Sequence, residues 1–155
     1  MSRPDINPAI GAMLRNASDW LAHEHSLFRT LNFEPLLVGK GKLSVAVDLP
    51  AGFTGAGGVI HGGLMTIIMD SIFGFTVFTA LDQLKPIATI NLRVDYIADA
   101  APGERVVCAG ECITIRDEVA YVSGDLKTQS TNKLIATGSG AFMVGTRGLK
   151  KESRL

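Results

Sequence analysis

Hydrophobic residues concentrate in one uninterrupted run near the middle of the chain, at residues 60–82. A Gly-Gly pair opens the run, no proline interrupts it, and every residue between positions 64 and 81 except Asp70 is apolar, small or hydroxylic. This pattern predicts a long helix that is buried nearly all round. A lone carboxylate in such a helix costs free energy unless it is paired, hydrogen-bonded or protonated, so Asp70 is the residue to explain.

The same run is long enough for a membrane span, which needs roughly 20 apolar residues. The central Asp70 and the absence of a flanking cluster of Lys and Arg argue against a span. We therefore expect a core helix wrapped by a sheet, and no membrane span. The residues expected in the core, some of which could also line a pocket, are Met65, Met69, Phe73, Phe75 and Phe78.

Alternation of apolar and polar residues predicts six strands around this helix. A Gly-Lys-Gly turn joins residues 34–39 and 42–49 into a hairpin. Four further strands, separated by short turns, are predicted at residues 87–97, 105–115, 119–128 and 134–144. In the first of these four, one face carries Ile90, Leu92, Val94 and Tyr96, and the other carries Thr89, Asn91, Arg93 and Asp95. Strands at this spacing predict an antiparallel meander that buries one face against the helix.

The two ends of the chain differ from this central part. Residues 5–31 predict one amphipathic helix, because apolar residues recur at helical spacing. These residues are Ile10, Leu14, Ala17, Leu21 and Phe28. We expect three segments: an N-terminal helical segment at 1–32, one α+β domain at 33–145 with a curled antiparallel sheet around a long central helix, and a polar, frayed tail at 146–155.

Composition restricts the binding partners and the cellular compartment that we expect for the protein. The chain has 155 residues, 46% of them apolar, and its 15 basic residues balance 15 acidic ones, so nothing indicates nucleic acid or another polyanion as a partner. The start of the chain lacks the layout of a signal peptide, and we expect the protein in the cytoplasm. Cys108 and Cys112 would stand roughly 13 Å apart on one strand, too far for a disulfide. The three scattered His residues give no metal-ligand spacing, so no metal is expected.

One local motif gives a more specific indication. His61-Gly62-Gly63 opens the long helix, and Asp70 follows nine residues after the histidine. The strand after the helix begins Pro-Ile-Ala-Thr-Ile-Asn-Leu at residues 86–92. With this combination, residues 35–145 resemble the hotdog-fold thioesterases, and most closely the PaaI-type acyl-CoA thioesterases. The resemblance implies a hotdog fold and the hydrolysis of an acyl-CoA or related thioester to a free acid and a thiol.

The resemblance also implies roles for individual residues. The backbone N–H of Gly62 would polarise the thioester carbonyl, and Asp70 would act as general base on a water or as a nucleophile. Thr89 would hold that water or position the acid, and His61 would help to place the thioester. The positions that would bind substrate are Gly63, Asn91 and Gly55, the last of which is often Asn or Gln in these enzymes.

Physical chemistry supports this arrangement beside the resemblance. A helix N-terminus offers free N–H groups that stabilise an oxygen gaining negative charge, and glycine lets a carbonyl approach them. Asp70 lies roughly 13 Å along the helix from His61 and about half a turn around it, so the two cannot meet at one substrate within one chain. They can meet when two helices pack antiparallel across a two-fold axis. We therefore expect an obligate homodimer with shared sites, with a dimer of dimers as a further option.

Other functions stay open at the level of the sequence. A non-catalytic acyl-CoA or lipid-binding module on the same fold is favoured by the glycine at position 55, where no amide is present. A hotdog dehydratase is a weaker alternative. The expected partner is an acyl-CoA substrate, with no cofactor beyond the CoA portion of that substrate. The acyl group itself is left open.

Overall fold

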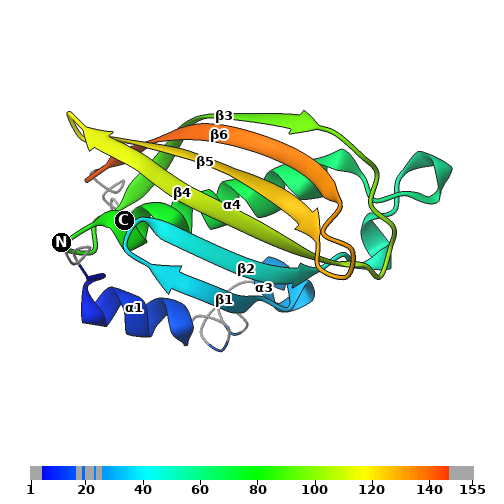
Figure 1. Ribbon diagram of the computed structural model, residues 1–155, viewed down its shortest axis with the longest axis horizontal. Helices are drawn as coiled ribbons and strands as arrows, with labels where there is room; N and C mark the ends of the chain where they lie inside the picture. The colour runs from blue at the N-terminus through cyan, green and yellow to red at the C-terminus, as the bar shows by residue number, and fades with distance from the viewer. Residues whose placement is uncertain (1–4, 17–18, 20–22, 24–25, 147–155) are drawn as a thin grey trace, which may run out of the picture.

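A curled sheet wraps around one long helix, and two short helices lie beside the first hairpin (Figure 1). The computed structural model describes residues 5–16, 19, 23 and 26–146. The described helices are α1 (Pro8–Arg15), α3 (Ser26–Leu31) and α4 (Gly62–Ala80). The strands are β1 (Glu34–Gly39), β2 (Lys42–Asp48), β3 (Ile87–Tyr96), β4 (Arg105–Arg116), β5 (Val119–Thr128) and β6 (Leu134–Val144). The predicted α+β class, with its curled antiparallel sheet around a central helix, is confirmed.

The order of strands in the sheet corrects one prediction. The sheet runs β1-β2-β4-β5-β6-β3, and all of its pairings are antiparallel. Strands β4, β5 and β6 form the expected meander, but β3 pairs with β6 at the far edge instead of with β4. The reason is that β2 already occupies the other side of β4, so the free edge of β6 is the one left for β3.

Within one chain, the central helix α4 is buried on the side that faces the sheet and not all round, so the prediction of nearly complete burial stays a prediction. Its buried residues are Leu64, Met65, Ile68, Met69, Ile72, Phe73, Gly74, Thr76, Val77 and Thr79. On the other side, Ile67 keeps 39% of its surface exposed and Asp70 is half-buried. The helix is long and apolar enough to cross a membrane, but 56% of its apolar window is buried inside the fold. The sheet-facing side therefore acts as the core of the domain.

A row of glycines lets the sheet approach α4 closely. Gly110, Gly124 and Gly138 are neighbours in register across β4, β5 and β6. A Cβ atom at Gly124 would stand 2.7 Å from the ring of Phe73, and one at Gly138 would stand 2.8 Å from the methyl group of Met69. Side chains of α4 therefore occupy the space that strand side chains would otherwise fill.

Substitution of Gly124 by Ala is expected to destabilise the fold strongly. The added Cβ would overlap the carbonyl oxygen of Ala109 on β4 as well as the ring of Phe73, and neither can move without shifting the sheet or the helix. Overpacking of this kind costs about 3 kcal/mol or more, which lowers the melting temperature by roughly 10 °C in a chain of this length. Thermal unfolding followed by circular dichroism measures it. Gly52→Ala is the control, because a Cβ there meets nothing within 4 Å. Equal melting temperatures for the two variants would contradict the glycine-row interpretation.

The N-terminal segment is divided where the sequence predicts one helix. Helix α1 ends at Arg15 with Asn16 as its C-cap, and α3 starts at Ser26. Ile10 and Leu14 are buried, as predicted, and α1 contacts both β1 and α4. The predicted apolar positions Ala17 and Leu21 lie outside the described residues. Residues 147–155, which make up most of the predicted polar tail, also lie outside them. The segment boundaries at 32 and 145 stay predictions.

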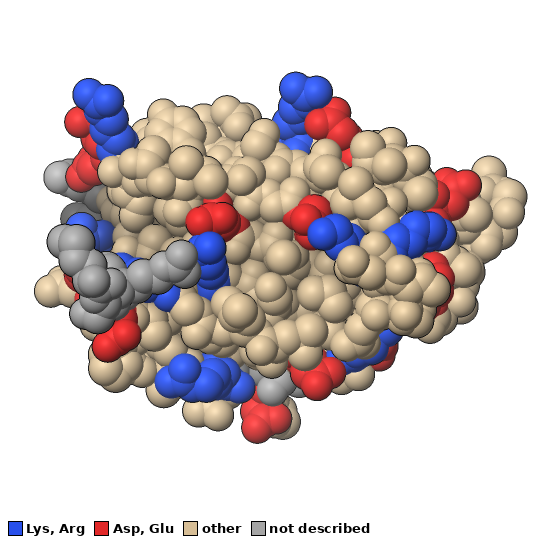
Figure 2. Space-filling model, viewed as in Figure 1, with Lys and Arg blue, Asp and Glu red and all other residues tan. Residues whose placement is uncertain are grey.

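Charged side chains are mixed rather than segregated on the face seen in Figure 2. Arg105 on β4 pairs with Asp48 on the neighbouring strand β2 and with Glu34 on β1, and Lys127 lies 3.2 Å from Asp125. Pairs of opposite sign this close cancel each other's field at a distance. This arrangement agrees with the zero net charge of the chain.

Candidate functional site

The His-Gly-Gly motif builds the N-terminus of α4. His61 is the N-cap, and its Nδ1 accepts a hydrogen bond of 2.9 Å from the backbone N–H of Gly63. A side chain at Gly63 would place its Cβ 2.9 Å from the same Nδ1, so this position must be glycine for the cap to form. Because Nδ1 acts as the acceptor, a neutral imidazole carries its proton on Nε2, which leaves an N–H donor on the exposed side of His61.

Gly62 has a different reason to be glycine. A Cβ there would lie 3.1 Å from the ring of Tyr96 at the end of β3, so the ring covers the first residue of the helix. The Tyr96 hydroxyl in turn shares a hydrogen bond with Thr66 Oγ1, one turn further along α4. Within the described residues, no hydrogen-bond acceptor is assigned to the Gly62 N–H, which is expected for the first N–H of a helix. This donor and the positive end of the helix dipole remain for an anionic or carbonyl oxygen.

Asp70 and Thr89 come together between α4 and β3. The Thr89 hydroxyl donates a hydrogen bond of 2.9 Å to Asp70 Oδ1. This contact supplies the partner that a carboxylate in an apolar helix requires, together with the partial exposure of Asp70. Because Asp70 has two oxygens and the bond uses one lone pair, the carboxylate keeps most of its capacity to accept a proton or a hydrogen bond.

A β-bulge in β3 is what turns Thr89 toward Asp70. The pairing with β6 goes from Thr89 opposite Phe142 to Asn91 opposite Ala141, so Ile90 is the extra residue. Thr89 therefore shares the helix-facing side with Leu92, and Ile90 is 50% exposed. The predicted strict alternation in this strand is wrong at this point, because a bulge changes which side each residue faces.

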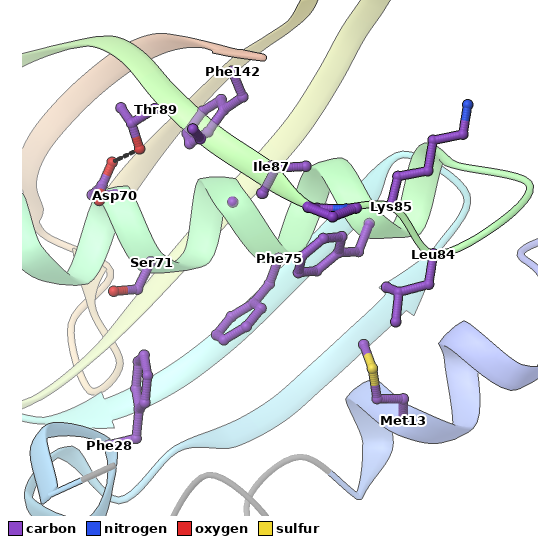
Figure 3. Close-up of a pocket in the computed structure, with 14 residues that line it drawn as sticks. Met13, Phe28, Asp70, Ser71, Phe75, Leu84, Lys85, Ile87, Thr89 and Phe142 are labelled. Atoms are coloured by element: carbon purple, nitrogen blue, oxygen red, sulfur yellow. Dashed lines mark hydrogen bonds between the residues drawn. The ribbon is translucent and has the colours of Figure 1, made fainter. Parts of the chain in front are cut away.

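A cavity of about 600 Å³ opens beside Asp70 and Thr89. Figure 3 shows the carboxylate and the threonine at one end, with Phe75 and Ile87 further along and Met13 and Leu84 at the other end. Its walls come from α4, from β3 and from both N-terminal helices, and are mainly apolar. Cavities of this size with a few polar groups at one place are typical of small-molecule sites.

The structure brings some predicted site residues together and keeps others apart. Asp70 and Thr89 line the cavity, whereas His61, Gly62 and Gly63 lie at the start of α4, about 12 Å away along the helix axis. Gly55 belongs to the helix start, because a Cβ there would lie 3.5 Å from His61. Asn91 pairs with Ala141 on the side of β3 opposite to Thr89, and is exposed.

Several cavity residues have no signal in the sequence that could have identified them. Met13, Phe28, Leu84 and Phe142 are far apart along the chain and come together through tertiary packing alone. The five Met and Phe residues that the sequence places in the core fall into two groups. Met65, Met69 and Phe73 are buried in the core, and Phe75 and Phe78 line the cavity.

Comparison with known proteins identifies the family. A sequence profile described as the thioesterase superfamily matches residues 57–135, from the loop before α4 to the start of β6. The chain belongs to the thioesterase superfamily. It is therefore a thioester hydrolase, and the matched region contains the helix start as well as the Asp70–Thr89 pair.

Relatives of this thioesterase agree in sequence and in fold. Human acyl-coenzyme A thioesterase 13 is 26% identical over 120 residues, which cover 73% of this chain and 85% of the relative. The solved structure of zebrafish thioesterase superfamily member 2 has a TM-score of 0.76 at 18% identity, and covers 88% of this chain and 98% of its own. The Escherichia coli PaaI protein has a TM-score of 0.74 at 11% identity, and the match covers 87% of this chain and 95% of the PaaI chain. These likenesses confirm the hotdog fold.

The two cysteines of this thioesterase lie outside the cavity. Both are free thiols, as predicted, with Cys108 buried and Cys112 half-buried. Burial raises the pKa of both thiols above the ordinary value, and Asp125 adds to the effect at Cys108. A thiol with a raised pKa is a poor nucleophile at neutral pH. In the part of the chain that the structure describes, no group of three His, Cys, Asp or Glu residues could hold a metal ion.

Proposed function

We propose that this thioesterase hydrolyses acyl-CoA thioesters to a free acid and CoA, with Asp70 as the residue that activates or performs the attack. The observation that carries the proposal is the Asp70 carboxylate, held by Thr89 at one end of an apolar cavity. The name of the human relative supports the substrate class, because it is an acyl-coenzyme A thioesterase. A Streptococcus mutans protein of similar fold was solved bound to acetyl CoA. Its TM-score is 0.67 at 19% identity, and the match covers 76% of this chain and 92% of that chain.

The reaction begins with a water beside Asp70. Asp70 takes a proton from the water, and the water oxygen attacks the thioester carbonyl carbon. The carbonyl electron pair moves to its oxygen, where a backbone N–H from a helix start stabilises the negative charge. Collapse of this intermediate breaks the C–S bond, and the CoA sulfur takes the proton from Asp70 and leaves as a thiol. Direct attack by the Asp70 carboxylate is the second route, and an acyl group on the protein in a single turnover, detected by mass spectrometry, would identify it.

The helix start that serves this reaction comes from a second copy of the chain. Gly62 and Asp70 are eight residues apart on one straight helix, about 12 Å, which is too far for both to contact one thioester group. Two α4 helices packed antiparallel across a two-fold axis would place Gly62 of each copy beside Asp70 of the other. The exposed Ile67 on the open side of α4 supports such a homodimer, as does the outer edge of β3, which has no strand partner among the residues that the structure describes. A further dimer of dimers, like the cytoplasmic location, stays a prediction.

Mixed dimers test the shared site. We expect Asp70→Asn and Gly62→Pro chains to be nearly inactive alone and to regain about a quarter of wild-type activity after co-refolding in equal amounts. Half of the randomly formed dimers then contain both chains, and each of these has one intact site out of two. Thiol release measures the recovery, and each variant refolded with itself is the control. A mixture as inactive as its components would contradict the shared site.

The substrate class is tested by thiol release from a panel of acyl-CoA thioesters, including an aryl-acetyl member, at neutral pH. Turnover of at least one member is expected. Saturable binding of acyl-CoA without turnover would contradict the proposal and favour a binding module, for which the missing side chain at Gly55 beside His61 is the relevant observation.

A further inference from the structure

The N-terminal helices contribute to the cavity beside the candidate catalytic pair. We infer that Met13 of α1 sets the length of the acyl group along a wall that Phe28 of α3 holds rigid, and that the preferred substrates carry an unbranched medium-chain acyl group. The inference rests on the proposed function, because it assumes that the cavity beside Asp70 receives the acyl part of the thioester.

The cavity is polar at one end and apolar beyond it. Asp70 and Thr89 form the polar end, and Ser71 next to them uses its hydroxyl in a hydrogen bond of 2.8 Å to the carbonyl of Ile67. Further along α4 the cavity is lined by Phe75 and Phe78. An acyl group whose carbonyl lies beside Asp70 would therefore extend over apolar side chains, where burial of each methylene is favourable.

The apolar lining from Asp70 past Phe75 and Phe78 forms a path for the acyl group, and the length of this path determines which acyl groups fill it. From Asp70 to Phe78 the lining residues of α4 span about 12 Å along the helix axis. A single aromatic ring next to the carbonyl would reach only the first part of this path, toward Phe75. A straight chain of medium length would follow the path to Met13, as the arrangement of side chains in Figure 3 indicates.

Aromatic rings make one wall of the path rigid. Phe28 packs against Phe75 with ring centroids 5.8 Å apart, and against the buried Phe33 in an edge-to-face contact at 4.9 Å. Phe75 also contacts Phe78 at 6.3 Å. Phe28 therefore joins α3 to α4 through ring packing, and cannot move aside without loss of these contacts.

Met13 closes the end of the path that is furthest from Asp70. It is half-buried, and it lies with Leu84 at this end in Figure 3. Helix α1 is held there by the side chain of Asn7, whose Nδ2 donates a hydrogen bond of 2.7 Å to the carbonyl of Asp82 after α4. A methionine side chain is flexible enough to adapt to a chain end, while a larger side chain on this anchored helix would shorten the path.

The test is a chain-length profile of kcat/KM for acyl-CoA thioesters from butanoyl to palmitoyl, with wild type, Met13→Trp and Ala12→Trp. The control Ala12→Trp adds the same side chain to α1 one residue away, at an exposed position outside the cavity lining. For wild type we expect kcat/KM to rise by up to about fourfold per methylene as far as decanoyl. Met13→Trp should lower kcat/KM for decanoyl-CoA by about tenfold or more, with the butanoyl value changed less than about twofold. The control should keep the wild-type profile.

Three results would overturn the inference: a wild-type preference for acetyl or aryl-acetyl thioesters, an unchanged profile in Met13→Trp, or an equal loss at every length. Met13→Ala provides a second variant in case Met13→Trp does not fold, and it should extend the preference toward longer chains because it opens the far end of the path. A failure of the proposed function is distinguishable, because no thioester would then be turned over at all. Turnover without any dependence of chain length on position 13 would contradict only the length assignment.

Discussion

Replacement of Asp70 by Asn is expected to lower kcat for thioester hydrolysis by about a hundredfold to ten-thousandfold. Asparagine has nearly the same shape and can still accept the hydrogen bond from Thr89, so the fold and the cavity should be preserved. It cannot take a proton from water at neutral pH, and it is a poor nucleophile. Steady-state thiol release with the best member of the acyl-CoA panel measures the loss.

The comparison that supports this prediction is between kcat and KM. Because Asp70 contributes to the reacting step, kcat should fall while KM changes little. Asp99→Asn, at an exposed position outside the cavity lining, is the matched control and should behave as wild type. An Asp70→Asn enzyme within tenfold of wild type, with an unchanged melting temperature, would exclude Asp70 as base or nucleophile.

Removal of a single backbone N–H at the start of α4 is expected to have the second-largest effect. Proline suits the first position of a helix, and His61 has the extended backbone, with φ −63° and ψ 131°, that precedes proline readily. Gly62→Pro therefore removes the N–H donor without breaking the helix. Loss of one donor to a developing oxyanion lowers kcat by about a hundredfold to a thousandfold.

Gly62→Ala is the matched control for this variant. Both substitutions place a Cβ at 3.1 Å from the Tyr96 ring, but alanine keeps the N–H. The difference in kcat between them isolates the donor from the crowding. If the two variants are equally active, the Gly62 N–H does not stabilise the transition state, and the helix start has a structural role only.

Local patterns in the sequence were sufficient to predict most elements of this fold. The hairpin formed by β1 and β2, the long helix and the last three strands were predicted within one or two residues of their ends. The signals there are strong: alternation with Leu43, Val45, Val47 and Leu49 all buried, and an apolar run bounded by glycine. The break at Asn16 in the N-terminal segment was missed, because helical spacing continues through it in the sequence.

Features that depend on distant parts of the chain could not be predicted in the same way. The position of β3 at the edge follows from competition between strands for β4, and alternation within one strand carries no information about its neighbours. The sequence does not show which part of the structure covers each side of α4, because an apolar run looks the same whether a sheet or a second chain covers it.

Some features of the candidate site could likewise be predicted from local sequence, and others depend on distant parts of the chain. Asp70 was singled out as the lone acid in an apolar run and the helix start by its glycine pair, whereas Thr89 came from the resemblance of its strand to a family. The bond between Thr89 and Asp70 requires Thr89 to pair opposite Phe142, and a strand that contains Ile90 reaches this register only by placing Ile90 in a bulge, for which the sequence gives no local signal. The cavity needs the contacts of two N-terminal helices with α4, so its far end could be identified only in the folded chain.

The bulge in β3 also determines where the gene can lose a codon. Ile90 is the extra residue, and its neighbours on either side already pair in register with consecutive residues of β6. Deletion of Ile90 would leave Thr89 opposite Phe142 and Asn91 opposite Ala141, now as a regular ladder, with Thr89 still on the side of Asp70. Deletion of Leu92 instead would shift the strand by one and exchange its two sides. Loss of one residue among natural or engineered versions of this chain should therefore be accepted at position 90 and rejected two residues later.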